Sequence, residues 1–299
     1  MPSFRPEPYL ASRAALVDRA LDRILKDPGG CPPSLLRAMR YSVFAGGKRL
    51  RPVLCMAAAE AVGLRASVAL RPACALELVH TYSLIHDDLP ALDDDDLRRG
   101  RRTNHVVFGE DRAILAGDAL LTLAFEVISN PQGLSRERVR NVPGAVRELA
   151  SQAGFAGMVG GQVSDLEAEG KRPTLARVLS IHRRKTGALL SASVRLPAIL
   201  QGVPPAVLSA LTRYGRSAGL AFQVVDDVLN ETGDARTLGK AAGSDKARGK
   251  MTYPAAAGLD AARRRVDELT KDAIRALAPL GRRAEPLRGL ALHMARRTN

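Results

Sequence analysis

The chain is poor in aromatic residues and in cysteine. Among its 299 residues there is no Trp, aromatic side chains make up 4%, and there are 3 Cys. With so few rings, successive bases of a single-stranded nucleic acid would find few side chains on which to stack. Cys31, Cys55 and Cys74 are an odd number without metal-ligand spacing, so we expect no disulfide framework and a reducing compartment.

Long apolar runs are also missing. No stretch reaches the roughly 18 uncharged residues that a membrane-spanning helix needs. Charged side chains interrupt the first 25 residues, where a signal peptide would need a continuous apolar core. We therefore expect a cytoplasmic protein without stable membrane insertion.

Helical periodicity is present almost throughout. Apolar residues recur three and four positions apart, and the alternation typical of strands is almost absent. Glycine and proline breaks separate these runs at 28–30, 131–133, 170–173 and 202–205, and at Gly233 and Gly243. We expect about ten helices in a single all-α domain over 1–299. Because 113–128 and 189–200 lack a clear polar face, they should lie inside, around a core or cavity.

The charge is unevenly distributed. The chain has a net charge of +14, with 45 Lys and Arg against 31 Asp and Glu. The planar guanidinium group of arginine binds phosphate well, so the many arginines are consistent with a phosphorylated ligand. A biased amino-acid composition is the alternative explanation for arginines scattered along the chain. A nucleic-acid binder would need a recognised motif or interleaved aromatics, and neither is found, so no nucleic-acid partner is expected. The acidic residues, in contrast, gather in two places.

The first acidic segment, 86–100, follows the apolar run 75–85. Its first carboxylates should stand at the C-terminal end of a buried helix, where the helix dipole disfavours negative charge. A solvated acidic loop is the alternative, but the apolar helix before it and Arg98 and Arg99 after it favour a site. Carboxylates without His or Cys select hard cations, and Mg²⁺ also takes substrate phosphates. The segment predicts Mg²⁺ carrying a phosphorylated substrate.

The second acidic segment, 222–230, lies in another apolar run. Gln223, Asp226 and Asn230 share one face of the expected helix. Basic residues cluster in 46–52, which lacks the spacing of a Walker loop, and in 183–187, with Lys240 and Lys250 further along. Taken alone, each of these clusters would fit a solvated surface; together they predict a site for phosphate groups.

These segments resemble the short-chain trans-prenyl diphosphate synthases, most closely the bacterial farnesyl diphosphate synthases, over nearly the full length. The matching parts are 46–52, His80, 86–100, 157–166, 185–187, 222–227, 238–240, 249–250 and 252–254. The resemblance implies a helical fold around a deep central cavity, usually homodimeric, with two acidic segments facing each other. It also implies three Mg²⁺ ions on the diphosphate of an allylic substrate.

The resemblance assigns roles residue by residue. The metal site would contain Asp87, Asp88, Asp93, Asp226, Asp227 and Asn230, with Asp88 in a supporting role. The allylic diphosphate would contact Arg98, Lys185, Lys240 and Lys250, and that of isopentenyl diphosphate would contact Lys48, Arg51, His80 and Arg99. Thr186 and Gln223 would present oxygen atoms near the carbocation, so that the catalytic set is Arg98, Lys185, Thr186 and Gln223.

The implied reaction joins isopentenyl diphosphate to dimethylallyl or geranyl diphosphate and gives farnesyl diphosphate. Tyr82, five residues before Asp87, would stop the growing chain at fifteen carbons. Geranylgeranyl diphosphate synthase is the nearest alternative, and a non-catalytic subunit of a heteromeric synthase is a remote one that the intact first acidic segment disfavours. Head-to-head synthases and terpene cyclases should not need the Lys48, Arg51 and His80 set. One departure is Asn230, where the family has a third acid.

Overall fold

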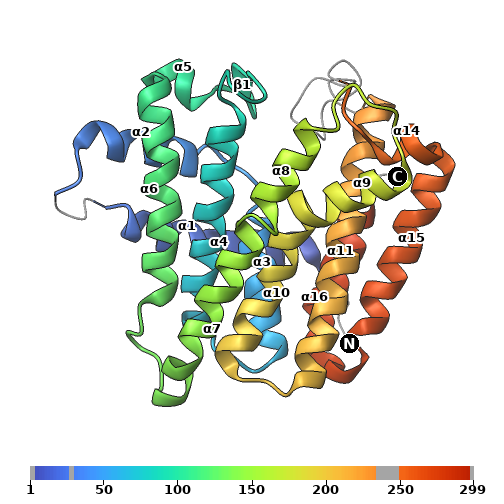
Figure 1. Cartoon of the computed structure of the whole chain (residues 1–299). Coiled ribbons are helices and arrows are strands. Elements are labelled where there is room, and N and C mark those ends of the chain that lie inside the picture. The colour runs from blue at the N-terminus through green and yellow to red at the C-terminus, as the bar shows by residue number, and fades with distance from the viewer. Residues whose placement is uncertain (1–3, 27–29, 234–248, 297–299) are drawn as a thin grey trace.

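The computed structural model describes residues 4–26, 30–233 and 249–296. In these residues the all-α expectation is confirmed: helices dominate, and the strands are two residues long (Figure 1). The elements are α1 Pro6–Ile24, α2 Pro33–Val43, α3 Leu50–Ala61, α4 Ala66–Asp87, β1 Leu97–Arg98, β2 Arg101–Arg102, α5 Asn104–Phe108, α6 Glu110–Ser129, α7 Arg136–Ala153, α8 Met158–Leu166, α9 Leu175–His182, η1 Arg183–Gly187, α10 Ala188–Gln201, α11 Pro205–Thr232, α14 Tyr253–Ala257, α15 Leu259–Ala276, η2 Ala278–Ala284 and α16 Glu285–Ala295.

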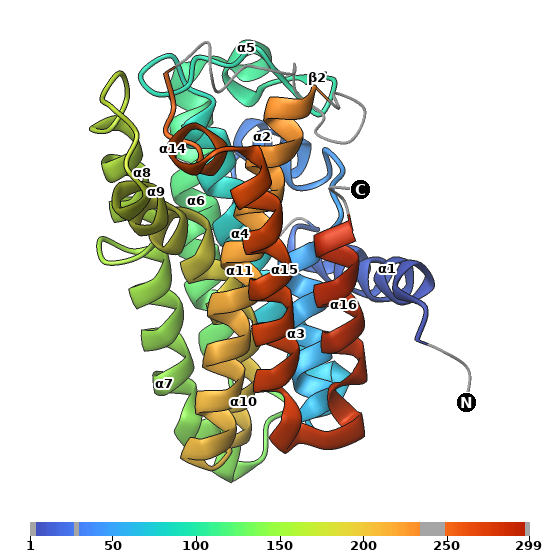
Figure 2. The same ribbon diagram turned by 90° about the vertical axis from the view of Figure 1, so that its right-hand side faces the viewer.

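The long helices form a bundle with its axis vertical in Figure 1, and α1 crosses it at one side (Figure 2). Helix α10 packs against α3, α7 and α11, and nearly all of its side chains are buried. The expectation that 189–200 lies inside is therefore confirmed. An apolar surface on all sides of a helix is stable only where neighbouring helices cover it.

The same expectation for 113–128 is wrong. Helix α6 packs on α4 but lies on the face of the bundle toward the viewer in Figure 1. Ile114 and Leu115 on its outer side are 43% and 57% exposed. The absence of a polar face here reflects an apolar surface that this chain alone does not cover, not a central position.

The C-terminal ends of α4 and α11 bring the two acidic segments to the same end of the bundle, at the top of Figure 1. The β1–β2 hairpin follows α4, and α14 lies near the end of α11. Between α9 and α10 the chain forms the five-residue π-helix η1, a form that often occurs at functional sites. No helix in the described ranges is both long and apolar enough to cross a membrane.

Candidate active site

Two adjoining compartments open at this end of the bundle and collect most of the predicted site residues. The acidic compartment, about 220 Å³, is lined by Asp87, Asp93, Lys185, Asp227 and Lys250 among others. The basic compartment, about 700 Å³, is lined by Lys48, Arg51, His80, Arg99 and Asp226 among others. Leu84, Arg98, Thr186 and Gln223 line both. Of the described residues, Lys185 and Lys250 of the predicted allylic set line only the acidic compartment, and the four predicted isopentenyl residues line only the basic one, while Arg98 lines both.

Asp87 is the last residue of α4 and faces the acidic compartment. Its carboxylate makes no hydrogen bond or ion pair with any residue that the structure describes. Burial, with the nearby Asp93 carboxylate adding to it, raises the pKa of Asp87 to about 6, against the lowering effect of Lys185. A buried carboxylate without a partner is a ready ligand for a cation.

Asp88 holds Arg98 in place. The Arg98 Nε atom donates to both carboxylate oxygens of Asp88, at 2.7 and 2.9 Å. The two-residue turn between β1 and β2 has positive φ at Arg99 (54°) and Gly100 (73°), a conformation that twists the hairpin to match its strands. This turn places Arg98 on Asp88 and lets Arg99 donate to the carbonyl of Gly46. The role predicted for Asp88, support of the metal ligands Asp87 and Asp93, stays a prediction.

Asp165 connects the two lysines of the acidic compartment, and sequence reasoning gave it no role. The Lys185 Nζ atom donates to Asp165 Oδ2 at 2.7 Å, and Lys250 Nζ lies 3.5 Å from the same oxygen. Asp165 is on α8 and is 6% exposed. Gly161 lies on α8 one turn before Asp165. A β-carbon at this position would lie 2.2 Å from the backbone nitrogen of Lys185, so only glycine lets α8 approach η1 this closely. The indication available in the sequence was that Asp165 lies within 157–166, a segment that resembles the prenyl diphosphate synthases.

Asp227 is engaged with protein groups. It accepts from the Tyr253 backbone at 2.7 Å and from Gln223 Nε2 at 3.2 Å, and His182 Nε2 lies 3.3 Å away. Gln223 in turn accepts from the Thr186 hydroxyl at 2.7 Å. These bonds fix the wall between the compartments. The sequence did not indicate a role for His182, because a single histidine near the end of a helix forms no recognisable motif.

The basic compartment is strongly electropositive and partly desolvated. The Arg51 Nε atom is buried without a hydrogen-bond partner in the described residues, and burial lowers the pKa of Arg51 to about 10. Burial, and then the neighbouring Arg51 and Arg99 charges, lower the pKa of His80 well below its usual value. Unpaired buried donors are costly unless an anion satisfies them. The compartment therefore suits an anionic ligand, with Lys48 exposed at its rim.

Arg49 supports this compartment from behind, and sequence reasoning did not single it out. It has a left-handed φ of 48° before α3 and is 5% exposed. Its guanidinium donates to Glu77 at 2.7 Å, Asp18 at 2.8 Å and the Val43 carbonyl at 2.6 Å. A buried arginine with all of its donors engaged fixes the loop that carries Lys48 and Arg51.

Besides Asp88, two predicted residues line neither compartment, and a third is not described by the structure. Asn230 is buried on α11 one turn beyond Asp226 and lines neither compartment. Tyr82 is 6% exposed within the core, with its ring edge-on to His86 at 5.7 Å between centroids, and lines neither compartment. Lys240 lies outside the described residues.

Comparison with known proteins identifies the family of this chain. The polyprenyl synthetase family model matches residues 32–278. Farnesyl diphosphate synthase of Escherichia coli is 50% identical over 82% of both chains, and geranylgeranyl pyrophosphate synthase 4 of Arabidopsis thaliana is 46% identical over 91% of this chain and 72% of that protein. The crystal structure of an FPP/GFPP synthase from Zymomonas mobilis superposes with a TM-score of 0.86 at 36% identity, covering 97% of this chain and 98% of that one.

These matches run through both compartments and cover most of the fold. The predicted resemblance and the assignment as a prenyl-transferring enzyme are confirmed. The chain belongs to the polyprenyl synthetase family and is a short-chain prenyl diphosphate synthase.

Proposed function

We propose that the enzyme condenses isopentenyl diphosphate with dimethylallyl and then geranyl diphosphate to give farnesyl diphosphate. The observation that carries this proposal is the pair of compartments that meet at Thr186 and Gln223. The basic compartment would hold the isopentenyl diphosphate and the acidic compartment the allylic one. Their shared wall then brings the two reacting carbons together, since positioning supplies much of the acceleration in a two-substrate reaction.

The donor atoms of the acidic compartment fit magnesium. Among the described residues no three carboxylate or imidazole groups converge as a ready ligand set. The Asp87 carboxylate is nevertheless unpaired, and Asp93 lines the same space, so carboxylate oxygens, which Mg²⁺ prefers, face it. We propose that Asp87 and Asp93, with Asp226 from the adjoining basic compartment, hold three Mg²⁺ ions together with the substrate. Bound magnesium would neutralise negative charge on the departing diphosphate.

The reaction begins when the allylic carbon–oxygen bond breaks and its electron pair leaves with the diphosphate. Arg98, Lys185 and Lys250 line the compartment proposed for the allylic diphosphate, so they would stabilise the transition state more than the substrate. The Thr186 hydroxyl and the Gln223 amide direct their oxygen dipoles toward the carbocation. The isopentenyl double bond then forms the new carbon–carbon bond, and the proton it loses passes to the departing diphosphate. Leu84 and Phe222 help to exclude water, which would quench the cation.

A fifteen-carbon product is favoured by Tyr82. This bulky ring lies in the core near the end of α4, one to two turns before Asp87, where the growing chain would end. The Escherichia coli farnesyl diphosphate synthase is similar over 82% of the chain. A twenty-carbon product is the second candidate, because the Arabidopsis geranylgeranyl pyrophosphate synthase is similar over 91%.

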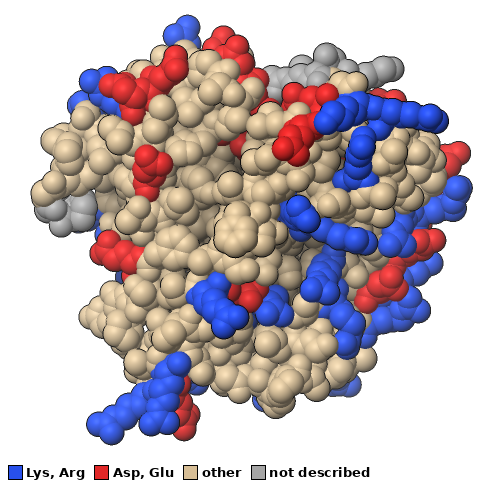
Figure 3. Space-filling model, viewed as in Figure 1, with Lys and Arg blue, Asp and Glu red and all other residues tan. Residues whose placement is uncertain are grey.

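We also propose that the enzyme is a cytoplasmic homodimer. Ile114 and Leu115 on α6, Phe155 before α8, and Val159 and Val163 on α8 are exposed, and Phe155 is 90% exposed. The surface over α6 and α7 is largely uncharged at its centre (Figure 3). Exposed apolar side chains gathered on one face are typical of a protein interface. The three free cysteines suit a reducing compartment. Phe155→Asp should convert a dimer to a monomer in sedimentation velocity, whereas a monomeric unsubstituted protein would contradict the dimer.

The reaction is tested with labelled isopentenyl diphosphate and geranyl diphosphate, with Mg²⁺ or with EDTA. The proposal predicts transfer of label into a longer prenyl diphosphate only when the metal is present. Asp87→Asn should abolish transfer, and Asp96→Asn, at an exposed position in the same segment, is the matched control. Transfer that survives both EDTA and Asp87→Asn would overturn the metal site, and absence of transfer with every allylic primer would overturn the function.

A further inference from the structure

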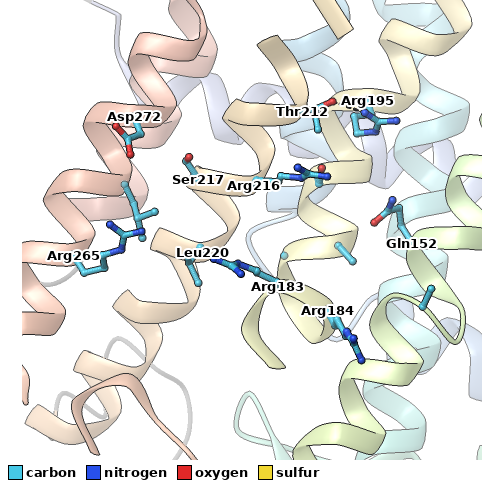
Figure 4. Close-up of a pocket in the computed structure, with 15 residues that line it drawn as sticks. Gln152, Arg183, Arg184, Arg195, Thr212, Arg216, Ser217, Leu220, Arg265 and Asp272 are labelled. Carbon is cyan, nitrogen blue, oxygen red and sulfur yellow. Dashed lines mark hydrogen bonds between the residues drawn. The ribbon is translucent and has the colours of Figure 1, made fainter. Parts of the chain in front are cut away.

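A third recess lies on the outer side of η1 and shares no lining residue with the two compartments. It occupies about 600 Å³ between η1, α10, α11 and α15, with the end of α7 at its edge (Figure 4). Five of its lining residues are arginines and one is an aspartate. The five arginines that define this arginine recess are Arg183, Arg184, Arg195, Arg216 and Arg265. None of them belongs to the predicted active site.

Two of these arginines are neutralised and three are not. Arg195 forms a bidentate pair with Glu148 at 2.7 and 3.0 Å, and Arg265 pairs with Glu268 at 2.8 Å. Arg183, Arg184 and Arg216 make no hydrogen bond or ion pair with any residue in the described ranges. Figure 4 shows Arg183 and Arg216 reaching into the recess from η1 and α11, with Arg265 reaching toward it from α15. These three side chains are exposed, and their positive charges remain available to an anion in the recess.

The floor of the recess gives an independent sign of a ligand. Ser191 on α10 lines it and is 6% exposed, and its hydroxyl has no hydrogen-bond partner in the part of the chain that the structure describes. This hydroxyl is not among the fully enclosed side-chain atoms, so it is accessible from the recess. A ligand with several oxygen atoms in the recess would accept hydrogen bonds from the Ser191 hydroxyl and from the arginine guanidinium groups at the same time.

The charge of the recess selects the ligand class. A carboxylate carries a single negative charge, whereas each phosphate group carries about 1.5 to 2 and offers three acceptor oxygens. Planar guanidinium groups bind such oxygens in pairs. Three exposed, unpaired arginines around an accessible hydroxyl therefore match two linked phosphates better than a carboxylate. We propose that the arginine recess binds the diphosphate group of a small anion.

The test is calorimetric titration of the full chain with inorganic diphosphate, in EDTA and at constant ionic strength. Arg183→Gln with Arg216→Gln should remove one bound diphosphate per chain from the stoichiometry, or weaken that site at least about tenfold. The matched control is Arg213→Gln with Arg264→Gln, which removes the same charge from exposed positions on α11 and α15 outside the recess. Equal binding by the two double variants would overturn the proposal.

The catalytic compartments would also bind diphosphate, so a second background keeps the sites apart. In a chain with Lys48→Gln and Lys185→Gln, the recess should still bind, and Arg183→Gln with Arg216→Gln should still abolish that binding. Ser191→Ala should weaken it roughly 2- to 12-fold through the lost hydrogen bond. Loss of all binding in the Lys48 and Lys185 background would place the ligand in the active site and overturn the recess.

Two sources can supply a diphosphate group: the inorganic ion that prenyl transfer releases, and a nucleoside diphosphate. Repeating the titration with ADP separates them. Displacement of inorganic diphosphate by ADP, sensitive to Arg183→Gln with Arg216→Gln, assigns the recess to nucleotides as well as the free ion. Binding of the inorganic ion alone assigns it to the reaction product.

Discussion

The Nζ atom of Lys250 lies 2.9 Å from Oδ1 of Asp93, although the two residues are 157 positions apart in the sequence. Their side chains are 12% and 8% exposed. This ion pair joins the first acidic segment to the residues before α14, across the acidic compartment. This ion pair should break when substrate and metal bind. Lys250 should then contact the allylic diphosphate, and Asp93 should contact a metal ion.

Removing the lysine charge should therefore weaken allylic binding. We expect Lys250→Gln to lower kcat/KM for geranyl diphosphate about 10- to 100-fold, the worth of a charged hydrogen bond, and to leave KM for isopentenyl diphosphate nearly unchanged. Steady-state kinetics with each substrate varied in turn measures both. Lys271→Gln, on the exposed side of α15, is the control. An equal rise in both KM values would place Lys250 outside the allylic site.

Truncating Tyr82 should lengthen the product. The ring is almost fully buried near the end of α4, so Tyr82→Ala opens space beside the core through which a longer chain can extend. Chromatography of the product alcohols should show twenty-carbon and longer species, while Tyr82→Phe, which retains the ring, should keep the fifteen-carbon product. An unchanged product length in Tyr82→Ala would mean that Tyr82 does not limit the growth of the prenyl chain.

Features that repeat or cluster along the sequence were predictable from it, whereas the roles of residues that act through tertiary contacts were not. Helical periodicity indicated the all-α fold, and the two acidic segments indicated most of the site, because those signs are local. The roles of Asp165, His182 and Arg49 were not predictable in this way, since each acts through residues distant in the chain. The outer position of α6 was also missed, because an apolar helix reads the same whether it faces a core or a second protein.

Asn230 replaces an acid that the family pattern has, and it follows Asp226 by one helical turn. A neutral amide oxygen binds Mg²⁺ more weakly than a carboxylate does. Asn230→Asp should therefore lower the Mg²⁺ concentration that gives half the maximal rate, which a metal titration of the initial rate measures. If Asn230→Asp leaves that concentration unchanged, position 230 lies outside the metal shell.

His80 should make the ligand-free enzyme sensitive to acid. Burial and the nearby arginines lower the pKa of His80 in the folded chain, whereas the unfolded chain binds a proton at about pH 6.5. The unfolded state then binds more protons below that pH, so folding stability falls as the pH drops, by up to about 1.4 kcal/mol per pH unit. Compared with the unsubstituted protein, His80→Gln should gain stability as the pH falls below 6.5. Urea unfolding at several pH values measures this difference.

The control for this prediction is His105→Gln, which makes the same substitution on α5, away from the basic compartment. Urea unfolding of this variant at the same pH values shows how much of any difference comes from a His-to-Gln change as such. A constant offset between His80→Gln and the unsubstituted protein from pH 7.5 to pH 5 would mean that His80 titrates alike in the folded and unfolded chain.

Farnesyl diphosphate offered as the allylic primer, with excess isopentenyl diphosphate and Mg²⁺, tests whether the product stops at fifteen carbons. The same preparation should elongate dimethylallyl and geranyl diphosphate to fifteen carbons and leave farnesyl diphosphate unextended. Accumulation of a twenty-carbon diphosphate from farnesyl diphosphate would contradict this expectation.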